Sequence, residues 1–576
     1  MRKLLKAARK EEPADLLLKG GTVANLYTME YEKADVAIKD GVIVGVGEGY
    51  EAHEIVDCAG KIIAPGFIDG HMHVESTFMV PRSLAAVIVP LGTTTIMPDP
   101  HEIANTCGIE GVRFMHSESL GLPIDMFFGA PSCVPASHFE TPKEPLFAKE
   151  IKKIFDEELC THLGEVMNFP GVILGDLDVW AKLDTARGRI ITGHAPGVTG
   201  GWLAAYLLGG ITSDHECDNA AEALEKMRRG MWVMIRQGAT ARNLASLAPL
   251  VRDKKLPASR SMAVSDDISP DFIAARGHMD GCVRELIAEG VLPLEALRLV
   301  TLSPAEYFRL YDRGAVAPGK TADLVLLGSV EKCDVQKVWK RGKPVAEDGK
   351  LLAPITPSIK GVMPGSAVTA PMPSVRALQV KCPDNSKTGV KINVIGAIRD
   401  QVATKKLVIE ATVKDGFAVA DSGSDLAKIA VVEKNQGTGR TAVGFIQGYG
   451  LGRGAIASSI AHDAHNFVCV GMDDLSMVTA LNKLKEIGGG IALALDRDIL
   501  ATLELPAGGL MSPLQFDELR VEIAKLREAL KELRADNPDA LMQLSFMSLS
   551  VIPELKLTDK GYFDISGGGE QPLFVK

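Results

Sequence analysis

Two histidines one residue apart, His71 and His73, follow an apolar run at residues 62–68 and a glycine at position 70. Because residues i and i+2 of a strand point to the same face, both imidazoles would leave the strand end on one side. That geometry suits two bonds to one metal ion. Two surface histidines after a buried strand are the alternative, and ligand-type residues at later strand ends would decide between the two interpretations.

Such residues do follow at the ends of later predicted strands. Strand-like runs at 62–68, 94–97, 125–129, 165–169, 190–192, 211–213, 232–235 and 262–264 alternate with stretches of helical spacing, such as 220–229 and 281–288. This pattern favours a (β/α)8 TIM-like barrel, whose functional residues follow the C-terminal ends of its strands. A doubly wound open sheet is the alternative, but its glycine-rich phosphate loop is missing from the sequence. The candidate site residues at these ends are His71, His73, His101, Glu102, Glu165, His194, His215, Glu216 and Asp266.

Four histidines and two carboxylates of this set are too many ligands for one tetrahedral ion and about right for two ions that share a bridge. Glu165 can place one oxygen on each ion, and Asp266 would complete the site. Imidazole and carboxylate ligands without thiolate suit Mn(II), Fe(II) or Zn(II). The predicted metal ligands are His71, His73, Glu165, His194, His215 and Asp266.

The predicted chemistry is hydrolysis at an electrophilic carbon. A divalent metal lowers the pKa of bound water from about 15.7 to about 7, so a hydroxide nucleophile becomes available at neutral pH. Asp266, which would touch both the metal and the bridging solvent, is the predicted acceptor of its proton. The attacked carbon could belong to an amide, an ester, a cyclic imide or an amino-substituted ring.

Length and composition limit the remaining possibilities. At 576 residues the chain is too long for one core, so we expect two or three domains. The net charge of −10 argues against a nucleic-acid or anionic-membrane partner. The 9 cysteines are scattered without a CxxC pair, which indicates reduced thiols in a cytoplasmic protein. No uninterrupted apolar run reaches the roughly 18 residues that a membrane span needs.

The pattern along the chain predicts a β-sandwich interrupted by the barrel. Short, glycine-punctuated strands occur at 14–63 and return at 314–340, so residues 1–63 and 313–352 would form the sandwich around a catalytic barrel at 64–312. A proline-rich linker at 353–374 would lead to a C-terminal α+β domain at 375–576, with strands at 408–413 and 417–420 and an amphipathic helix at 516–533. The segment 460–466 of this domain, IAHDAHN, is either a capped turn or part of the site.

The strand order and ligand set resemble the amidohydrolase superfamily. Many of its members bridge their metals with a carboxylated lysine on the fourth strand, where this chain has Glu165, a difference that speaks against hydantoinase or dihydroorotase activity. More specifically, the chain resembles the bacterial adenine deaminase family over nearly its whole length. The matching stretches are APGFIDGHMHVEST, MPDPHEIANTCG, GEVMNFPGV, ITGHAPG, TSDHE, VSDD, IAHDAHN and MSLSVIPELKLTDKGYFD, of which the last two lie in a C-terminal domain that most amidohydrolases lack.

This resemblance implies that adenine and water become hypoxanthine and ammonia in purine salvage, with Mn(II) or Fe(II) as the metal. Glu216 is the candidate for protonating a ring nitrogen, or else a carboxylate at a helix N-terminus. Asp266 would pass its proton to the departing amino group. His101 and Glu102 are candidates for contacting the purine edge, and His465 for closing over it.

We expect a homodimer whose partner is a small purine, without nucleic acid or membrane. Two other functions stay open at this point. One is an amidohydrolase that cuts a cyclic amide or an N-acyl group, and the other is a non-catalytic scaffold that kept the barrel and lost the chemistry.

Overall fold

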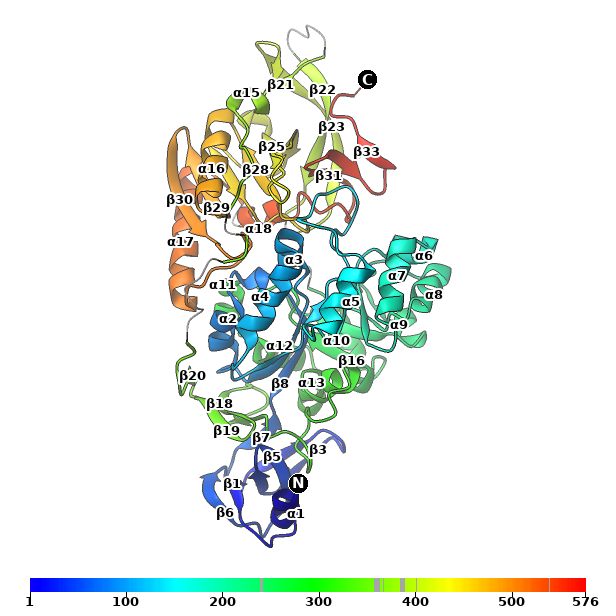
Figure 1. The fold of residues 1–576 in the computed structure, drawn as a ribbon, viewed down its shortest axis with the longest axis vertical. Helices are drawn as coiled ribbons and strands as arrows, with labels where there is room; N and C mark the ends of the chain where they lie inside the picture. The colour runs from blue at the N-terminus through cyan, green and yellow to red at the C-terminus, as the bar shows by residue number, and fades with distance from the viewer. Residues whose placement is uncertain are drawn as a thin grey trace.

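The computed structural model describes residues 1–238, 242–356, 363–365, 367–383, 389–399, 401–537 and 539–575. Along its long axis the N-terminal strands lie at one end, a helix–strand region in the middle and the C-terminal region at the other end (Figure 1). The predicted linker at 353–374 lies partly outside the described residues, at 357–362 and 366. Within the described ranges, no helix has both the length and the apolar character needed to cross a bilayer.

The N-terminal end is built from two segments far apart in the sequence. After helix α1 (Arg2–Ala8) its strands are β1 (Ala14–Lys19), β2 (Thr22–Asn25), β3 (Glu30–Lys33), β4 (Val36–Lys39), β5 (Val42–Val46), β6 (Ala52–Asp57), β7 (Ile62–Pro65), β17 (Leu324–Leu327), β18 (Val335–Lys340), β19 (Lys343–Glu347) and β20 (Lys350–Leu351). They form a four-stranded sheet, β5-β4-β1-β6, and a seven-stranded sheet, β20-β19-β18-β17-β7-β2-β3. The predicted pairing of the early and late segments is present, because β7 runs antiparallel to β17 with Ile63 opposite Leu326.

The middle region contains short parallel strands, and each strand is followed by a loop or a helix. The strands are β8 (Phe67–Met72), β9 (Thr93–Pro98), β10 (Asp125–Met126), β11 (Gly129–Ala130), β12 (His162–Val166), β13 (Ile191–Gly193), β14 (Ser213–Asp214), β15 (Trp232–Arg236) and β16 (Ser261–Val264). They pair as three parallel sheets, β10-β9-β8, β11-β12-β13 and β14-β15-β16. The predicted alternation of strands and helices is therefore confirmed, but the described residues do not form one closed hydrogen-bonded sheet.

Helices separate most of these strands. They are α2 (Pro81–Ile88), α3 (His101–Cys107), α4 (Ile109–Ser119), α5 (Ala148–Asp156), α6 (Phe169–Leu174), α7 (Leu177–Thr185), α8 (Gly200–Leu208), α9 (Ala220–Arg228), α10 (Leu244–Arg252), α11 (Pro270–Arg276), α12 (Met279–Ala288), α13 (Pro293–Leu299) and α14 (Leu302–Tyr307). The predicted helices at 220–229 and 281–288 correspond to α9 and α12.

Several predicted strands differ from the structure in their bounds. The run predicted at 125–129 is divided into β10, which pairs with β9, and β11, which pairs with β12, and the strand predicted at 211–213 is Ser213–Asp214. The run at 62–68 is not one strand, because Gly66 breaks it into β7 of the N-terminal sheet and β8 of the middle region. The Gly66 amide donates to the carbonyl oxygen of Asp323 at 2.8 Å, and a Cβ at Gly66 would collide with the side chain of Thr94. The strand predicted at 165–169 ends at Val166, because Asn168 caps α6 by accepting a 2.9 Å hydrogen bond from the Gly171 amide.

The C-terminal region is a mixed sheet with helices. Its elements are α15 (Val375–Leu378), β21 (Val380–Lys381), β22 (Gly389–Ala397), β23 (Thr404–Lys414), β24 (Phe417–Ala418), β25 (Leu426–Val432), β26 (Thr441–Gln447), β27 (Ala455–Ser458), β28 (Phe467–Gly471), α16 (Asp474–Glu486), β29 (Gly490–Leu495), β30 (Asp498–Glu504), α17 (Phe516–Glu532), α18 (Ala540–Ser545), β31 (Leu555–Thr558), β32 (Gly561–Asp564) and β33 (Gly569–Gln571). Strands β21 to β30 form one ten-stranded sheet, and β31 to β33 a small second one. The predicted helix at 516–533 is α17, which also contacts the middle region through a 2.6 Å ion pair between Arg527 and Asp271 of α11.

Candidate metal centre

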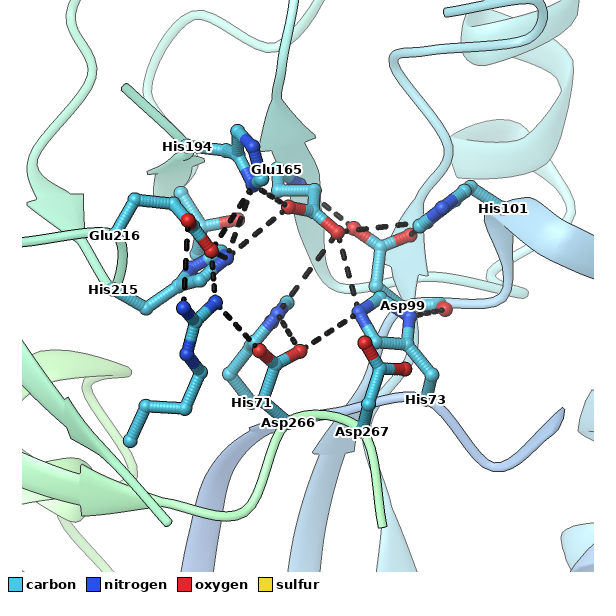
Figure 2. A network of polar contacts seen from close by, with 12 residues as sticks. His71, His73, Asp99, His101, Glu165, His194, His215, Glu216, Asp266 and Asp267 are labelled. Atoms are coloured by element: carbon cyan, nitrogen blue, oxygen red, sulfur yellow. Dashed lines mark hydrogen bonds and ion pairs between the residues drawn. The ribbon is translucent and has the colours of Figure 1, made fainter. Parts of the chain in front are cut away.

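The predicted metal ligands meet at the C-terminal ends of the parallel strands. His71 lies on β8 and Glu165 on β12, while His194 and His215 directly follow β13 and β14. Figure 2 shows these side chains around the carboxylate of Glu165, with Asp266 on the opposite side. The structure thus brings together six side chains that are spread over about 200 residues of sequence, as parallel strand ends require. They are His71, His73, Glu165, His194, His215 and Asp266.

The two oxygens of Glu165 face two different pairs of histidines. Oε1 lies 3.3 Å from His73 Nε2 and 3.9 Å from His71 Nε2. Oε2 lies 2.8 Å from His194 Nδ1 and 3.3 Å from His215 Nε2. A carboxylate in this position can be shared by two cations, one beside each histidine pair.

The donor atoms fit a divalent cation. Asp266 Oδ1 lies 3.3 Å from His73 Nε2 and 3.6 Å from His71 Nε2, on the side of the first histidine pair. His71 Nε2 is buried and makes no hydrogen bond within the described chain. Leaving such an atom unpaired costs about 1–3 kcal/mol, which a bound cation would offset. Buried imidazole and carboxylate donors without thiolate are ligands of divalent transition metals, so these side chains fit a divalent metal site.

Burial and neighbouring charges have opposite effects on the pKa values of this cluster. Burial alone would raise the pKa of Glu165, but hydrogen bonds from His194, His215 and His73 hold that pKa well below its usual range. Burial alone would lower the pKa of His73, yet Asp266 and Glu165 keep it well above its usual value. The carboxylates therefore create a strongly negative environment, in which a metal cation would displace the histidine protons.

Asp99, on the loop after β9, fixes both a histidine and the shared carboxylate. Its Oδ2 accepts a 2.7 Å hydrogen bond from the backbone amide of Glu165, and its carbonyl oxygen lies 3.2 Å from His73 Nδ1. When Nδ1 of His73 donates to this carbonyl, Nε2 keeps its lone pair for a cation. Sequence reasoning did not assign Asp99 a role, although it stands in the DPHE stretch that also holds His101 and Glu102.

A second buried network orients the loops that carry His194 and His215. Asp214 Oδ1 accepts a 2.7 Å hydrogen bond from the amide of Ala195, next to His194. Its Oδ2 lies 3.0 Å from the ammonium of Lys226, which also donates to the carbonyl of Ala195 and to Glu222 at 2.7 and 2.6 Å. Because Asp214 and Lys226 are fully buried, this network joins the ends of β13 and β14 rigidly.

Glu216, the predicted proton donor, lies beside the second histidine pair. Its Oε1 is 3.4 Å from His215 Nε2 and 3.7 Å from His194 Nδ1. The guanidinium of Arg236, at the end of β15, forms an ion pair with it. Burial would raise the pKa of Glu216, but Arg236 and the two histidines together lower it. Local sequence carries no signal for Arg236, since its partners Glu216 and Asp266 lie after other strands.

His101, Glu102 and His465 lie on the side of the centre that faces the C-terminal region. His101 Nδ1 is 3.6 Å from Glu165 Oε1. Glu102 is buried between two histidines of segment 460–466, with Oε1 3.2 Å from His462 Nδ1 and Oε2 3.8 Å from His465 Nε2. The C-terminal region therefore contributes side chains to the surroundings of the metal centre, and His462 among them was not predicted.

A cleft of about 510 Å³ lies between the middle and C-terminal regions. One of its lining residues, Ser132, donates a 2.5 Å hydrogen bond to the carbonyl oxygen of Glu165, so one wall of the cleft adjoins the metal centre. Its polar lining includes Ser132, Asn168, Lys182, Gln436, Arg440 and Lys560.

Comparison with known proteins places this geometry in a family. Residues 62–345 match the amidohydrolase family, and residues 401–568 match the adenine deaminase C-terminal domain. An adenine deaminase of Desulfatibacillum aliphaticivorans is 40% identical over 98% of both chains, and one of Cereibacter sphaeroides is 42% identical over 98% of both chains. Among solved structures, dihydropyrimidinase from Brevibacillus agri is similar with a TM-score of 0.45 and 16% identity, over 59% of this chain and 96% of that one. The chain therefore belongs to the adenine deaminase family of the amidohydrolases.

Proposed function

We propose that this protein hydrolyses adenine to hypoxanthine and ammonia at two divalent cations held by the strand ends. The observation that carries the proposal is the carboxylate of Glu165, whose two oxygens face two separate histidine pairs. Similarity to adenine deaminases over 98% of the chain supports adenine as the substrate. Glu165 in place of a carboxylated lysine is consistent with this assignment.

The ligands divide into two groups around the shared carboxylate. His71, His73 and Asp266 would hold one cation, and His194 and His215 the other, with Glu165 common to both. Bound divalent cations lower the pKa of water and so supply a nucleophile near neutral pH. Mn(II) or Fe(II) is the proposed metal, with Zn(II) as the alternative.

The remaining side chains have roles in moving protons and holding the base. Water adds to carbon 6 of the purine while Asp266 takes one of its protons and delivers it to the amino group, which leaves as ammonia. Glu216 would protonate a ring nitrogen during the attack, which keeps negative charge from building up in the ring. His101, Glu102 and His465 would contact the purine edge, and the cleft beside Ser132 would be its route to the site.

We also infer that the three parallel sheets belong to one (β/α)8 barrel. The Asp266 amide, just after β16, donates to the carbonyl oxygen of His71 on β8 at 3.0 Å. The Thr212 amide, just before β14, donates to the carbonyl oxygen of Ile191 on β13, also at 3.0 Å. These bonds support connections between the sheets that would close a ring.

The proposed domains are a sandwich at 1–63 and 313–352, the barrel at 64–312 and an α+β domain at 375–576. A homodimeric enzyme of cytoplasmic purine salvage stays a prediction of the sequence.

Ammonia release from adenine, with and without added Mn(II), tests the proposal directly. Dihydroorotate, a hydantoin and an N-acyl amino acid serve as comparison substrates for other amidohydrolase activities. The proposal requires ammonia from adenine, stimulation by the metal and little turnover of the other compounds. Turnover of a cyclic amide with none of adenine would contradict it.

A further inference from the structure

Arg236 links the two carboxylates to which catalysis is assigned. Its side chain is buried at the end of β15 with 4% exposure. Nη1 contacts Glu216 Oε1 and also donates to Asp266 Oδ2 at 2.9 Å, while Nη2 lies 3.4 Å from Glu216 Oε2. Nη1 therefore contacts both Asp266, the proposed proton acceptor beside His71 and His73, and Glu216, the carboxylate beside His194 and His215.

The backbone of Arg236 is itself held against the segment after β14 that carries Glu216. Its amide donates a 2.6 Å hydrogen bond to Oδ1 of Asn243. The amide group of Asn243 in turn donates to the carbonyl oxygens of His215 and Cys217, at 3.0 Å each. His215 and Cys217 flank Glu216. Asn243 therefore ties the backbone of Arg236 to the backbone on both sides of Glu216, while the two side chains contact each other directly.

Glu216 lies close enough to the metal site to become a ligand. Its Oε1 is 3.4 Å from His215 Nε2 and 3.7 Å from His194 Nδ1, distances typical of two ligands of one ion. Carboxylate oxygens bind Mn(II), Fe(II) and Zn(II) readily. A free Glu216 would therefore occupy a coordination position that a catalytic metal site must leave open.

We propose that Arg236 is a positioning residue that engages both carboxylate oxygens of Glu216, so that they do not coordinate the cation of the His194–His215 pair and the carboxylate faces the substrate. The inference rests on the proposed function. The planar guanidinium suits this task because it reaches both Glu216 and Asp266 in a fixed geometry, which the point charge of a lysine ammonium cannot reproduce. By holding Oδ2 of Asp266, it also directs Oδ1 towards His71 and His73.

The test compares four Co(II)-loaded proteins: wild type, Arg236→Met, the double variant Arg236→Met/Glu216→Gln, and Arg229→Met as a matched control at the exposed end of α9. The visible absorption of Co(II) weakens as its coordination number rises, and metal content is measured in parallel. We expect Arg236→Met to keep its cations, to show weaker Co(II) absorption and to lose about 100-fold or more in kcat for adenine, since small misplacements of catalytic groups cost that much.

The double variant makes the assignment specific. Its absorption should return to that of wild type, because the glutamine amide binds cations poorly, while kcat stays low. Wild-type kcat in Arg236→Met would overturn the inference, as would a spectral change that persists in the double variant. If Arg236→Met does not fold, Arg236→Lys with and without Glu216→Gln gives the same comparison. Failure of the proposed function can be told apart from failure of this inference. In that case wild type would release no ammonia from adenine, while the Co(II) spectra would still report on the role of Arg236.

Discussion

The backbone amide of Glu165 donates a 2.7 Å hydrogen bond to the carboxylate of Asp99. This bond joins β12 to the segment after β9. It does so at Glu165, whose side chain faces both histidine pairs. The Asp99 carbonyl, 3.2 Å from His73 Nδ1, orients a ligand of the first pair at the same time. The position of the shared carboxylate is therefore set by neighbouring strands as well as by its own.

Glu165→Gln should lower metal content and rate together. A neutral amide offers one carbonyl oxygen and no charge, so it bridges two cations poorly. We expect loss of at least one of the two cations by metal analysis and a fall in kcat of roughly 100-fold or more. Glu110→Gln, an exposed change on α4, is the control and should leave both quantities unchanged. Full metal occupancy in Glu165→Gln would show that the bridge lies elsewhere.

His465→Ala tests the contribution of the C-terminal region. The imidazole is fully buried and its Nε2 lies 3.8 Å from Glu102 Oε2. If His465 and Glu102 hold the purine, kcat/KM for adenine should fall about 10-fold or more while metal content stays at the wild-type level. His53→Ala, on exposed strand β6, serves as the control. Unchanged adenine turnover in His465→Ala would remove this residue from the site.

Lys226→Met should destabilise the protein and loosen the second histidine pair. The change leaves Asp214 buried without its cation, and breaking a buried ion pair costs about 3–5 kcal/mol. We expect a lower midpoint of thermal unfolding and weaker metal retention against a chelator. Lys152→Met removes an exposed pair with Asp156 and should cost less than about 0.5 kcal/mol. Equal stability of the two variants would mean that the Asp214 network does not support the site.

Lys556 predicts a pH dependence of stability. Burial lowers the pKa of Lys556 to about 7, and among the described residues its ammonium donates only to the carbonyl oxygens of Val402 and Phe546, at 2.6 and 3.0 Å. An unfolded lysine has a pKa of about 10.4, so between these two values the unfolded chain binds more protons and this residue makes stability rise with pH.

The measurement is the free energy of unfolding in urea at pH 7 and pH 9.5, for wild type and Lys556→Met. The rise in stability should be roughly 1–4 kcal/mol larger in wild type than in the variant. Exposed Lys405→Met should behave like wild type. The same pH dependence in wild type and Lys556→Met would contradict the expected titration of this side chain.

The six predicted ligands could be located from sequence because each follows a recognisable strand, and parallel strand ends must meet at one edge. Spacing made His71 and His73 candidates, and the strand order that added Glu165, His194, His215 and Asp266 decided in favour of a metal site. Their meeting in the structure follows from that topology, while their roles as ligands stay a proposal until metal is measured.

Other features depend on contacts that local sequence does not encode. Arg236 resembles any charged residue at the end of a strand, and only folding brings it to Glu216 and Asp266. The break at Gly66 depends on its hydrogen bond to Asp323, more than 250 residues away. An apolar run such as 62–68 cannot show on its own where one sheet ends and another begins.

The most direct test of the account is the anomalous scattering of a crystal of the Mn(II)-loaded protein. Two manganese peaks should flank the carboxylate of Glu165, one beside His71 and His73 and the other beside His194 and His215. A single peak, or peaks away from Glu165, would contradict the two-cation centre.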